Sequence, residues 1–192
     1  MKMKTLVKLG SNLLIVSLIT ACGASDTTAK VNSFTLSSSS YANNTPIPTR
    51  NVCSQNNGLN QSPQLSWENA PQGTSKYAII MDDEVNPCGT GDNACTHWIF
   101  LNIPSTIKEL NENLDISTIS GTVEGGTYNG TADYEGPCPP LKHIYKTTIF
   151  ALNDSMPILS YIETTRSAFQ TTYASHILGT ATLVGTFDPA SH

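Results

Sequence analysis

The sequence predicts a mainly β protein, a sandwich of two packed antiparallel sheets with one or two short helices near the C-terminus. Four short segments are rich in β-branched and aromatic residues, and clusters of Gly, Pro and Asn separate them. One helical pattern lies between the last two segments. No internal repeat and no second zone of composition is visible, so we expect a single β-rich domain. The four strand segments are YAIIMDD (77–83), HWIFLNI (97–103), IYKTTIFAL (144–152) and TATLVGTF (180–187).

The N-terminus carries an export signal. Three lysines precede the short apolar run LLIVSLI, and small residues lead to Cys22. The stretch ITAC resembles a bacterial lipobox, which implies cleavage before Cys22 and acylation of this cysteine. The apolar run is too short for a lasting transmembrane helix. We therefore expect a lipoprotein signal peptide at 1–21, a lipidated cysteine with a small polar tether at 22–30, and the folded domain at 31–192. An ordinary secretory peptide with an incidental cysteine is the alternative.

Lipidation at Cys22 predicts where the protein resides. Several acyl chains on one residue give durable membrane anchoring, whereas a single chain binds reversibly. An Asp directly after the lipidated cysteine would resemble an inner-membrane retention signal. This chain has Gly23 at that position. The expected location is the bacterial cell envelope, with a lipid anchor in the outer membrane and the domain facing the periplasm.

The charge balance excludes some partners. Once the three lysines of the signal peptide are removed, seven Lys and Arg remain against fifteen Asp and Glu, which gives a net charge of -8. Nucleic acids and anionic membrane surfaces are recognised through dense basic patches. We therefore expect no nucleic-acid partner and no electrostatic membrane binding beyond the anchor.

Four cysteines remain after Cys22, and an exported protein occupies an oxidising compartment. An even number predicts disulfides with three possible connectivities. Cys88 and Cys95 flank a loop rich in Gly and Asn and form the first expected pair, which leaves Cys53 with Cys138. A zinc site is the rival interpretation, but the C-x6-C spacing without a second close pair matches structural zinc sites poorly. No metal and no cofactor are expected.

The remaining segments are assigned in chain order. Residues 37–51 are loop-like, because Pro46 and Pro48 forbid a regular central strand. The run IFLNI lacks alternation, which predicts a strand covered on both faces. In the helical segment Phe169, Tyr173 and Ile177 share one face, with an N-cap at Thr165 and Gly179 just past the end. We expect Trp67 and Trp98 to be core residues, His176 to be structural and His192 to lie in a frayed tail.

Polar residues recur at the ends of the predicted strands. Asp82 and Asp83 end one strand, His97 begins the next, and His143 with Tyr145 lies beside the turn YEGPCPP (134–140). The prolines stiffen this turn, so its free backbone amides and Tyr134 are held in place for binding. No nucleophile elbow, metalloprotease helix, Walker loop or dinucleotide fingerprint is present in the sequence.

Several motifs in unbroken order resemble the phosphatidylethanolamine-binding protein family, particularly its bacterial Raf-kinase-inhibitor-like branch. They are SPQLSW (62–67), the strand that ends in Asp82-Asp83, HWIFLNIP (97–104), YEGPCPPLKHIY (134–145) and HILGTATLVGTF (176–187). The resemblance covers residues 31–187 and implies a Greek-key β-sandwich with a small anion pocket. The matched pocket positions are Asp83, His97, Gly136, Pro139, Pro140, His143 and Tyr145, to which the stiffened turn adds Tyr134.

The sequence departs from the family pattern at two places. Where the family has D-P-D-A-P, this chain has Val85 in place of the second aspartate. The glycine usual before H-x-Y is absent, and Leu141 and Lys142 precede His143. The resemblance also implies a cis bond before the last proline of the pocket loop, which is Asn86-Pro87.

The expected function is a membrane-anchored periplasmic binding protein that holds a small phosphoryl-like anion. Protonated imidazoles at His97 and His143 and the hydroxyl of Tyr145 would donate hydrogen bonds to it, and Asp83 would orient a ring. The alternative is an inhibitor or regulator of an extracytoplasmic serine protease, with a periplasmic protein as partner. An acid-base enzyme is the least favoured interpretation, because the sequence shows no nucleophile with an adjacent base.

Overall fold

The structure is a computed structural model, described here for residues 32–191. The predicted signal peptide, Cys22 and the tether lie outside the described residues, as does His192. Within residues 32–191 no helix is long and apolar enough to cross a membrane.

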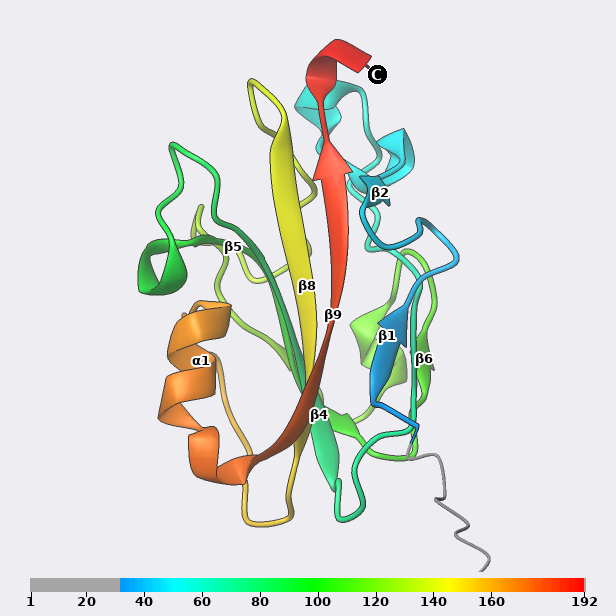
Figure 1. The fold of residues 1–192 in the computed structure, drawn as a ribbon, viewed down its shortest axis with the longest axis vertical. Helices are drawn as coiled ribbons and strands as arrows, with labels where there is room; N and C mark the ends of the chain where they lie inside the picture. The colour runs from blue at the N-terminus through cyan, green and yellow to red at the C-terminus, as the bar shows by residue number, and fades with distance from the viewer. Residues whose placement is uncertain (1–31, 192) are drawn as a thin grey trace, which may run out of the picture. The chain divides into compact units, whose positions relative to one another are not determined.

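Two sheets face each other in the described domain, as predicted (Figure 1). The smaller sheet has three strands in the order β1-β3-β6, and the larger has six in the order β2-β9-β8-β4-β5-β7. The strands of the smaller sheet are β1 (Thr35–Ser37), β3 (Leu65–Glu68) and β6 (Glu109–Leu110). Those of the larger sheet are β2 (Thr45–Pro46), β4 (Lys76–Asp83), β5 (Cys95–Pro104), β7 (Val123–Glu124), β8 (His143–Leu152) and β9 (Ile177–Phe187).

One strand pair at the edge of the larger sheet is parallel, a detail that the predicted antiparallel sandwich did not include. β2 pairs with β9 in parallel, whereas the other strand pairs of the described domain are antiparallel. β2 has only two residues and contains Pro46, which lacks the N–H that a central strand needs. The proline-containing segment 37–51 is therefore confined to the sheet edge.

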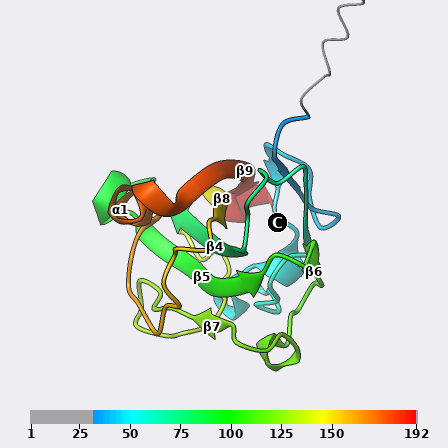
Figure 2. The ribbon, with the colours of Figure 1, turned by 90° about the horizontal axis from the view of Figure 1, so that it is seen from below.

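One α-helix and six short 3-10 helices complete the described domain. The helix α1 (Arg166–Thr172) lies on one side of the larger sheet, and the smaller sheet lies on the other (Figures 1 and 2). The 3-10 helices are η1 (Thr49–Asn51), η2 (Ser54–Asn56), η3 (Gly91–Asn93), η4 (Ile116–Thr118), η5 (Ala174–His176) and η6 (Pro189–Ser191).

The larger sheet is buried on both faces in its central strands. Tyr77, Ile79 and Met81 of β4 join the cluster between the two sheets, and Ala78 and Ile80 join the cluster on the other face, which also contains Phe169 of α1. β5 is buried throughout its interior, which confirms the prediction for IFLNI. Burial on both faces is what gives these strands their continuous apolar sequence. Trp67 and Trp98 are core residues, as predicted.

The helix is shorter than its sequence pattern predicts. The Thr165 side chain accepts a hydrogen bond from the Ala168 amide, so the predicted N-cap is confirmed. The helix nevertheless ends at Thr172, and Ile177, predicted as its last apolar position, begins β9 and pairs with Leu152 of β8. Gly179 lies inside this strand, opposite Ala151. Pairing with β8 along the whole strand outweighs one further helical turn.

Candidate functional site

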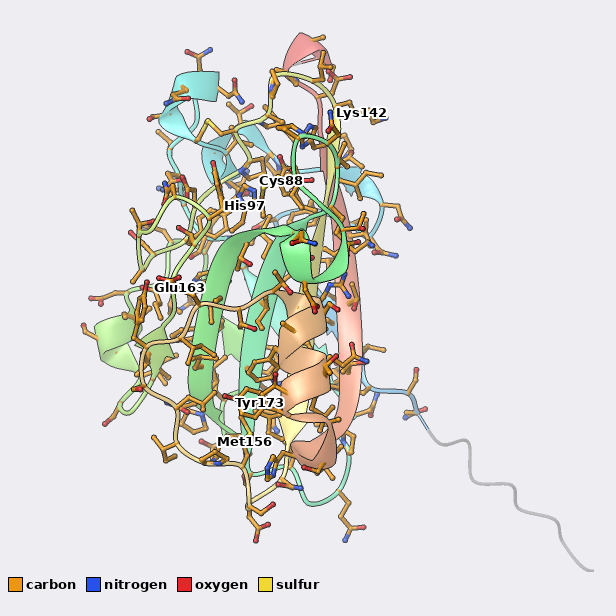
Figure 3. The ribbon with its side chains drawn as sticks, turned by 90° about the vertical axis from the view of Figure 1, so that its left-hand side faces the viewer. Cys88, His97, Lys142, Met156, Glu163 and Tyr173 are labelled. Atoms are coloured by element: carbon orange, nitrogen blue, oxygen red, sulfur yellow. A yellow bond between two sulfur atoms is a disulfide. The ribbon has the colours of Figure 1, made fainter. Side chains whose placement is uncertain are left out.

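A cavity of about 290 Å³ opens where β4 ends and where β5 and β8 begin. Figure 3 shows His97 and Cys88 toward this end of the domain, whereas Met156 and Tyr173 mark the opposite end. We call this cavity the histidine pocket. Its lining residues are Asp83, Pro87, Cys88, Cys95, His97, Tyr128, Cys138, Pro139, Pro140, His143 and Tyr145.

Strand pairing brings the polar residues of three strands together. Asp83 of β4 lies opposite Cys95 of β5 on one side and opposite Tyr145 of β8 on the other. His97 and His143 are each two residues from this row along their strands. Because side chains two residues apart share a face of a sheet, both imidazoles project on the same side as the row.

A β-bulge at His97 explains how a histidine lies within the buried strand. Met81 pairs with Trp98 and the next residue, Asp82, pairs with Thr96, so His97 is an extra residue in β5. A bulge lets two consecutive side chains take the same side of the sheet. Trp98 enters the core between the sheets, while His97 lines the pocket.

The His97 ring is held by the turn that follows Tyr134. Its Nδ1 lies 2.8 Å from the backbone carbonyl of Glu135, and the Glu135 amide donates to the His97 carbonyl at 2.9 Å. A carbonyl oxygen only accepts, so Nδ1 carries the proton in the neutral ring and Nε2 keeps its lone pair. Nε2 makes no hydrogen bond with a described residue. Burial lowers the pKa of His97, and the Glu135 carbonyl and the Asp83 carboxylate oppose this effect.

The second ring is held by a carboxylate. Nδ1 of His143 donates to Oδ2 of Asp83 at 2.5 Å, and both side chains are buried. The other Asp83 oxygen accepts the backbone amide of Val85 at 2.8 Å. Val85, the residue that departs from the family pattern, therefore contributes its backbone to the pocket loop and no second carboxylate. Nε2 of His143 makes no hydrogen bond within residues 32–191.

Tyr145 lies between the two imidazoles. Its ring is edge-on to His97 at 5.1 Å and stacked near His143 at 6.5 Å between centroids. The hydroxyl is buried and makes no well-formed hydrogen bond to a described residue. Burial and the Asp83 carboxylate raise the pKa of Tyr145, so the phenol stays protonated and remains a donor.

Two disulfides contribute to the walls of the histidine pocket. Cys88 bonds to Cys95 within the pocket loop, and Cys53 bonds to Cys138, which ties the proline turn to the segment after η1. These are the predicted pairs, so the four cysteines do not form the alternative zinc site. The Asn86-Pro87 bond is cis, as the family resemblance implied.

Tyr134 and Gly136 are not among the residues that line the histidine pocket. The Tyr134 hydroxyl donates to the carbonyl of Asn51 at 2.7 Å and is buried there. A Cβ on Gly136 would lie 2.6 Å from the same carbonyl, so only glycine permits this approach. Both residues fix the turn against η1, while Pro139 and Pro140 reach the pocket.

Tyr128 is a pocket residue that the sequence did not reveal. It lies in the loop GTYNG (126–130), which contains neither a strand pattern nor a family motif. Its amide donates to the Thr96 carbonyl, and its half-exposed ring lies 4.9 Å from that of His97. Only the three-dimensional contact with β5 identifies it.

No Lys or Arg lines the histidine pocket. Arg166 bonds to both Asp82 and Glu84, Lys146 bonds to Glu84, and the exposed Lys142 is not part of the lining. Positive charge on the lining itself therefore depends on protonation of the two imidazoles. Across residues 32–191 no cluster of three or more His, Cys, Asp or Glu is arranged to hold a metal ion.

Two relatives resemble much of this sequence. A UPF0098 protein of Chlamydia pneumoniae is 33% identical over 155 residues, which cover 80% of this chain and 97% of the relative. A UPF0098 protein of Aquifex aeolicus is 38% identical over 114 residues, which cover 59% of this chain and 63% of the relative, less than two thirds of its length.

Solved structures share the fold. The phosphatidylethanolamine-binding protein homolog CT736 from Chlamydia trachomatis has a TM-score of 0.69 and 28% identity, covering 82% of this chain and 98% of that one. YbcL of Escherichia coli, described as a new member of the mammalian PEBP family, has a TM-score of 0.70 and 26% identity. The match covers 81% of this chain and 98% of YbcL. The family model for phosphatidylethanolamine-binding proteins matches residues 37–188. The chain belongs to the phosphatidylethanolamine-binding protein family.

Proposed function

We propose that this protein is a cell-envelope binding protein that holds a small phosphoryl-like anion in the histidine pocket. One observation carries the proposal. Each imidazole has its Nδ1 occupied by a fixed acceptor, so both Nε2 atoms and the unpaired Tyr145 hydroxyl remain for a ligand. A tetrahedral oxyanion accepts hydrogen bonds at several oxygens, which suits the Tyr145 hydroxyl together with the Nε2–H groups of protonated imidazoles.

The protonation state of the rings decides which anions fit. A neutral ring with its proton on Nδ1 presents an acceptor at Nε2, which can take the O–H of a singly protonated phosphoryl group. Sulfate has no such proton at neutral pH, so it requires cationic rings. Charge-assisted hydrogen bonds are roughly twice as strong as neutral ones. Anion binding is therefore coupled to proton uptake by His97 and His143.

The pocket supports binding better than catalysis. Asp83 holds His143 as an orienting carboxylate holds a general base. However, the lining contains no Ser or Thr, and its three cysteines are in disulfides. A nucleophilic mechanism needs such a group beside the base. We therefore place the acid-base enzyme below the binding protein.

Matched substitutions test the proposal by calorimetry with sulfate at pH 5.5. Asn reproduces the Nδ1 donor of histidine but has no counterpart of Nε2. His97→Asn keeps a donor for the Glu135 carbonyl, and His143→Asn keeps one for Asp83. Loss of one charge-assisted hydrogen bond costs about 1.5–3 kcal/mol, so each variant should weaken sulfate by about tenfold or more. His176→Asn, which removes a histidine that contacts Ser155, is the control. Unchanged sulfate affinity in both pocket variants would refute the proposal.

The envelope location is the second part of the proposal and has its own test. Mass spectrometry of the mature protein from a bacterial host should find an N-terminal Cys22 that carries acyl chains. Cys22→Ser should remain in the soluble fraction of the cell envelope. An unmodified N-terminus elsewhere in the chain would contradict the lipoprotein assignment and leave the pocket argument standing.

A further inference from the structure

We infer that the anion is the phosphate of a sugar phosphate, whose hydroxylated part occupies a second cavity beside the histidine pocket. This inference rests on the proposed function and names the class of ligand. The second cavity, here called the polar cavity, has a volume of about 790 Å³. It shares Tyr128 and Cys138 with the histidine pocket, so the two spaces adjoin.

The polar cavity offers hydrogen-bonding groups and no cation. Its lining includes Ser54, Gln55, Thr131, Asp133 and Glu135, and contains no Lys, Arg or His. The carboxylates of Asp133 and Glu135 can accept hydrogen bonds from a ligand, and the hydroxyl and amide groups can supply both donors and acceptors. A sugar hydroxyl is donor and acceptor at once, so this mixture suits a polyol better than an apolar chain.

Two carboxylate oxygens of the polar cavity can accept further hydrogen bonds, a buried one on Glu135 and one on the exposed Asp133. Oε1 of Glu135 accepts from the Asn129 side-chain amide, while Oε2 is buried and makes no well-formed hydrogen bond to a described residue. Oδ1 of Asp133 accepts the Tyr134 amide at 2.7 Å, and Oδ2 has no hydrogen bond with a described residue. A buried acceptor without a donor is costly. Two hydroxyl groups on one ring can satisfy both oxygens, whereas one ammonium group would leave most of the cavity unfilled.

Tyr128 provides an aromatic surface at the junction. Its ring lines both cavities and is half exposed, at 49%. The C–H groups of a sugar ring can pack on an aromatic face, because aromatic rings combine a large apolar surface with a negative face. A phosphate beside His97 would therefore place the attached sugar carbon at Tyr128 and the hydroxyl groups beyond it.

Calorimetry with three probes at pH 6.0 tests this inference: inorganic phosphate, glucose 6-phosphate and phosphoethanolamine. Glucose 6-phosphate should bind at least about tenfold more tightly than inorganic phosphate, the gain expected from one or two additional hydrogen bonds to charged groups. Phosphoethanolamine should show no such gain.

Two variants assign the gain to the polar cavity. Asp133→Asn keeps the oxygen that accepts the Tyr134 amide and removes the free carboxylate oxygen. Ala132→Trp places a large side chain on an exposed lining residue and fills the cavity. Both should bring glucose 6-phosphate to within about threefold of inorganic phosphate, while the affinity for phosphate itself stays unchanged, since neither residue lines the histidine pocket.

Backbone amide NMR keeps the two proposals distinguishable. Glucose 6-phosphate should shift the amides of residues 129–135 beyond the shifts caused by phosphate. If phosphate binds but glucose 6-phosphate binds no more tightly, the sugar-phosphate inference is overturned and the anion pocket stands. If phosphoethanolamine binds more tightly than phosphate, the ligand carries an amine and the sugar-phosphate inference is overturned. Shifts of 129–135 by glucose 6-phosphate without phosphate binding would support the polar cavity and refute the anion pocket. Absence of all shifts would refute both.

Discussion

At the scale of single residues, the candidate site depends on which nitrogen of each histidine is engaged. His97 meets a backbone carbonyl and His143 meets a carboxylate, so both rings carry their Nδ1 proton inside the protein. The partners differ in charge. Burial lowers the pKa of His97, and the neutral Glu135 carbonyl opposes this effect only in part. The pocket thus holds one ring fixed by a neutral group and one ring fixed by a carboxylate.

The burial of His97 predicts how its protonation affects stability. Its pKa is lowered in the folded state and near 6.5 in the unfolded chain. Between these values the unfolded state binds more protons, so stability rises with pH in this window and is lost as pH falls below about 6.5. The free energy of unfolding in urea should therefore fall more between pH 7.5 and 5.5 in the wild type than in His97→Asn. An equal fall in the two proteins would show that His97 is not buried in its neutral form.

The two imidazoles together predict the pH dependence of anion binding. A ligand that prefers protonated histidine raises its pKa on binding and takes up protons, so affinity increases as pH falls. Sulfate keeps its charge across this range, whereas a phosphoryl ester gains charge near pH 6 and obscures the effect. Calorimetry should show tighter sulfate binding at pH 5.5 than at 7.5, with a smaller difference in His143→Asn. Affinity that does not depend on pH in the wild type would contradict the role of the imidazoles.

At the scale of elements, the two disulfides differ in what they stabilise. Cys53–Cys138 joins residues 85 apart in sequence, and Cys88–Cys95 joins residues 7 apart. Loop-closure entropy assigns about 4.5 kcal/mol to the long link and about 2.5 kcal/mol to the short one. Replacing Cys53 and Cys138 with serine should therefore lower the free energy of unfolding more than replacing Cys88 and Cys95. The two double variants are compared by urea denaturation, and equal losses would contradict this ranking.

The sequence predicted the long strands because their residues carry a strong local signal. β4, β5, β8 and β9 are runs of β-branched and aromatic residues, bounded by Gly, Pro or Asn. β1 and β6 were not predicted, because two or three residues cannot show a period. The early end of α1 was missed since Ile177 fits a helical spacing as well as a strand start. Ile177 begins a strand because it pairs with β8, a segment distant in sequence.

The candidate site was predictable only in part, for similar physical reasons. Asp83, His97, His143 and Tyr145 stand at the ends of predicted strands, and strand pairing brings them together. Tyr128 comes from a loop whose position depends on a backbone bond to Thr96, which no local pattern encodes. Tyr134 and Gly136 belong to the right turn but pack against η1, because the direction of a turn depends on its neighbours.

At the scale of the whole molecule, the histidine pocket joins distant segments of the chain. The loop after β4, the start of β5, the loop at Tyr128 and the proline turn before β8 all contribute to its lining. The sheet fixes the strand ends, and the disulfides fix the loops between them. A rigid assembly of this kind loses little conformational entropy on binding. The described domain thus resembles a preformed receptor for a small ligand.

Binding of an anion by the two Nε2 atoms can be observed by 15N NMR of the imidazole nitrogens. The chain has four histidines, so substitution of each in turn assigns the ring signals. Addition of sulfate at pH 6.0 should shift Nε2 of both His97 and His143 toward the protonated imidazolium value, while His176 and His192 stay unchanged. Sulfate that leaves both pocket Nε2 signals where they were, at concentrations that saturate calorimetric binding, would contradict the account.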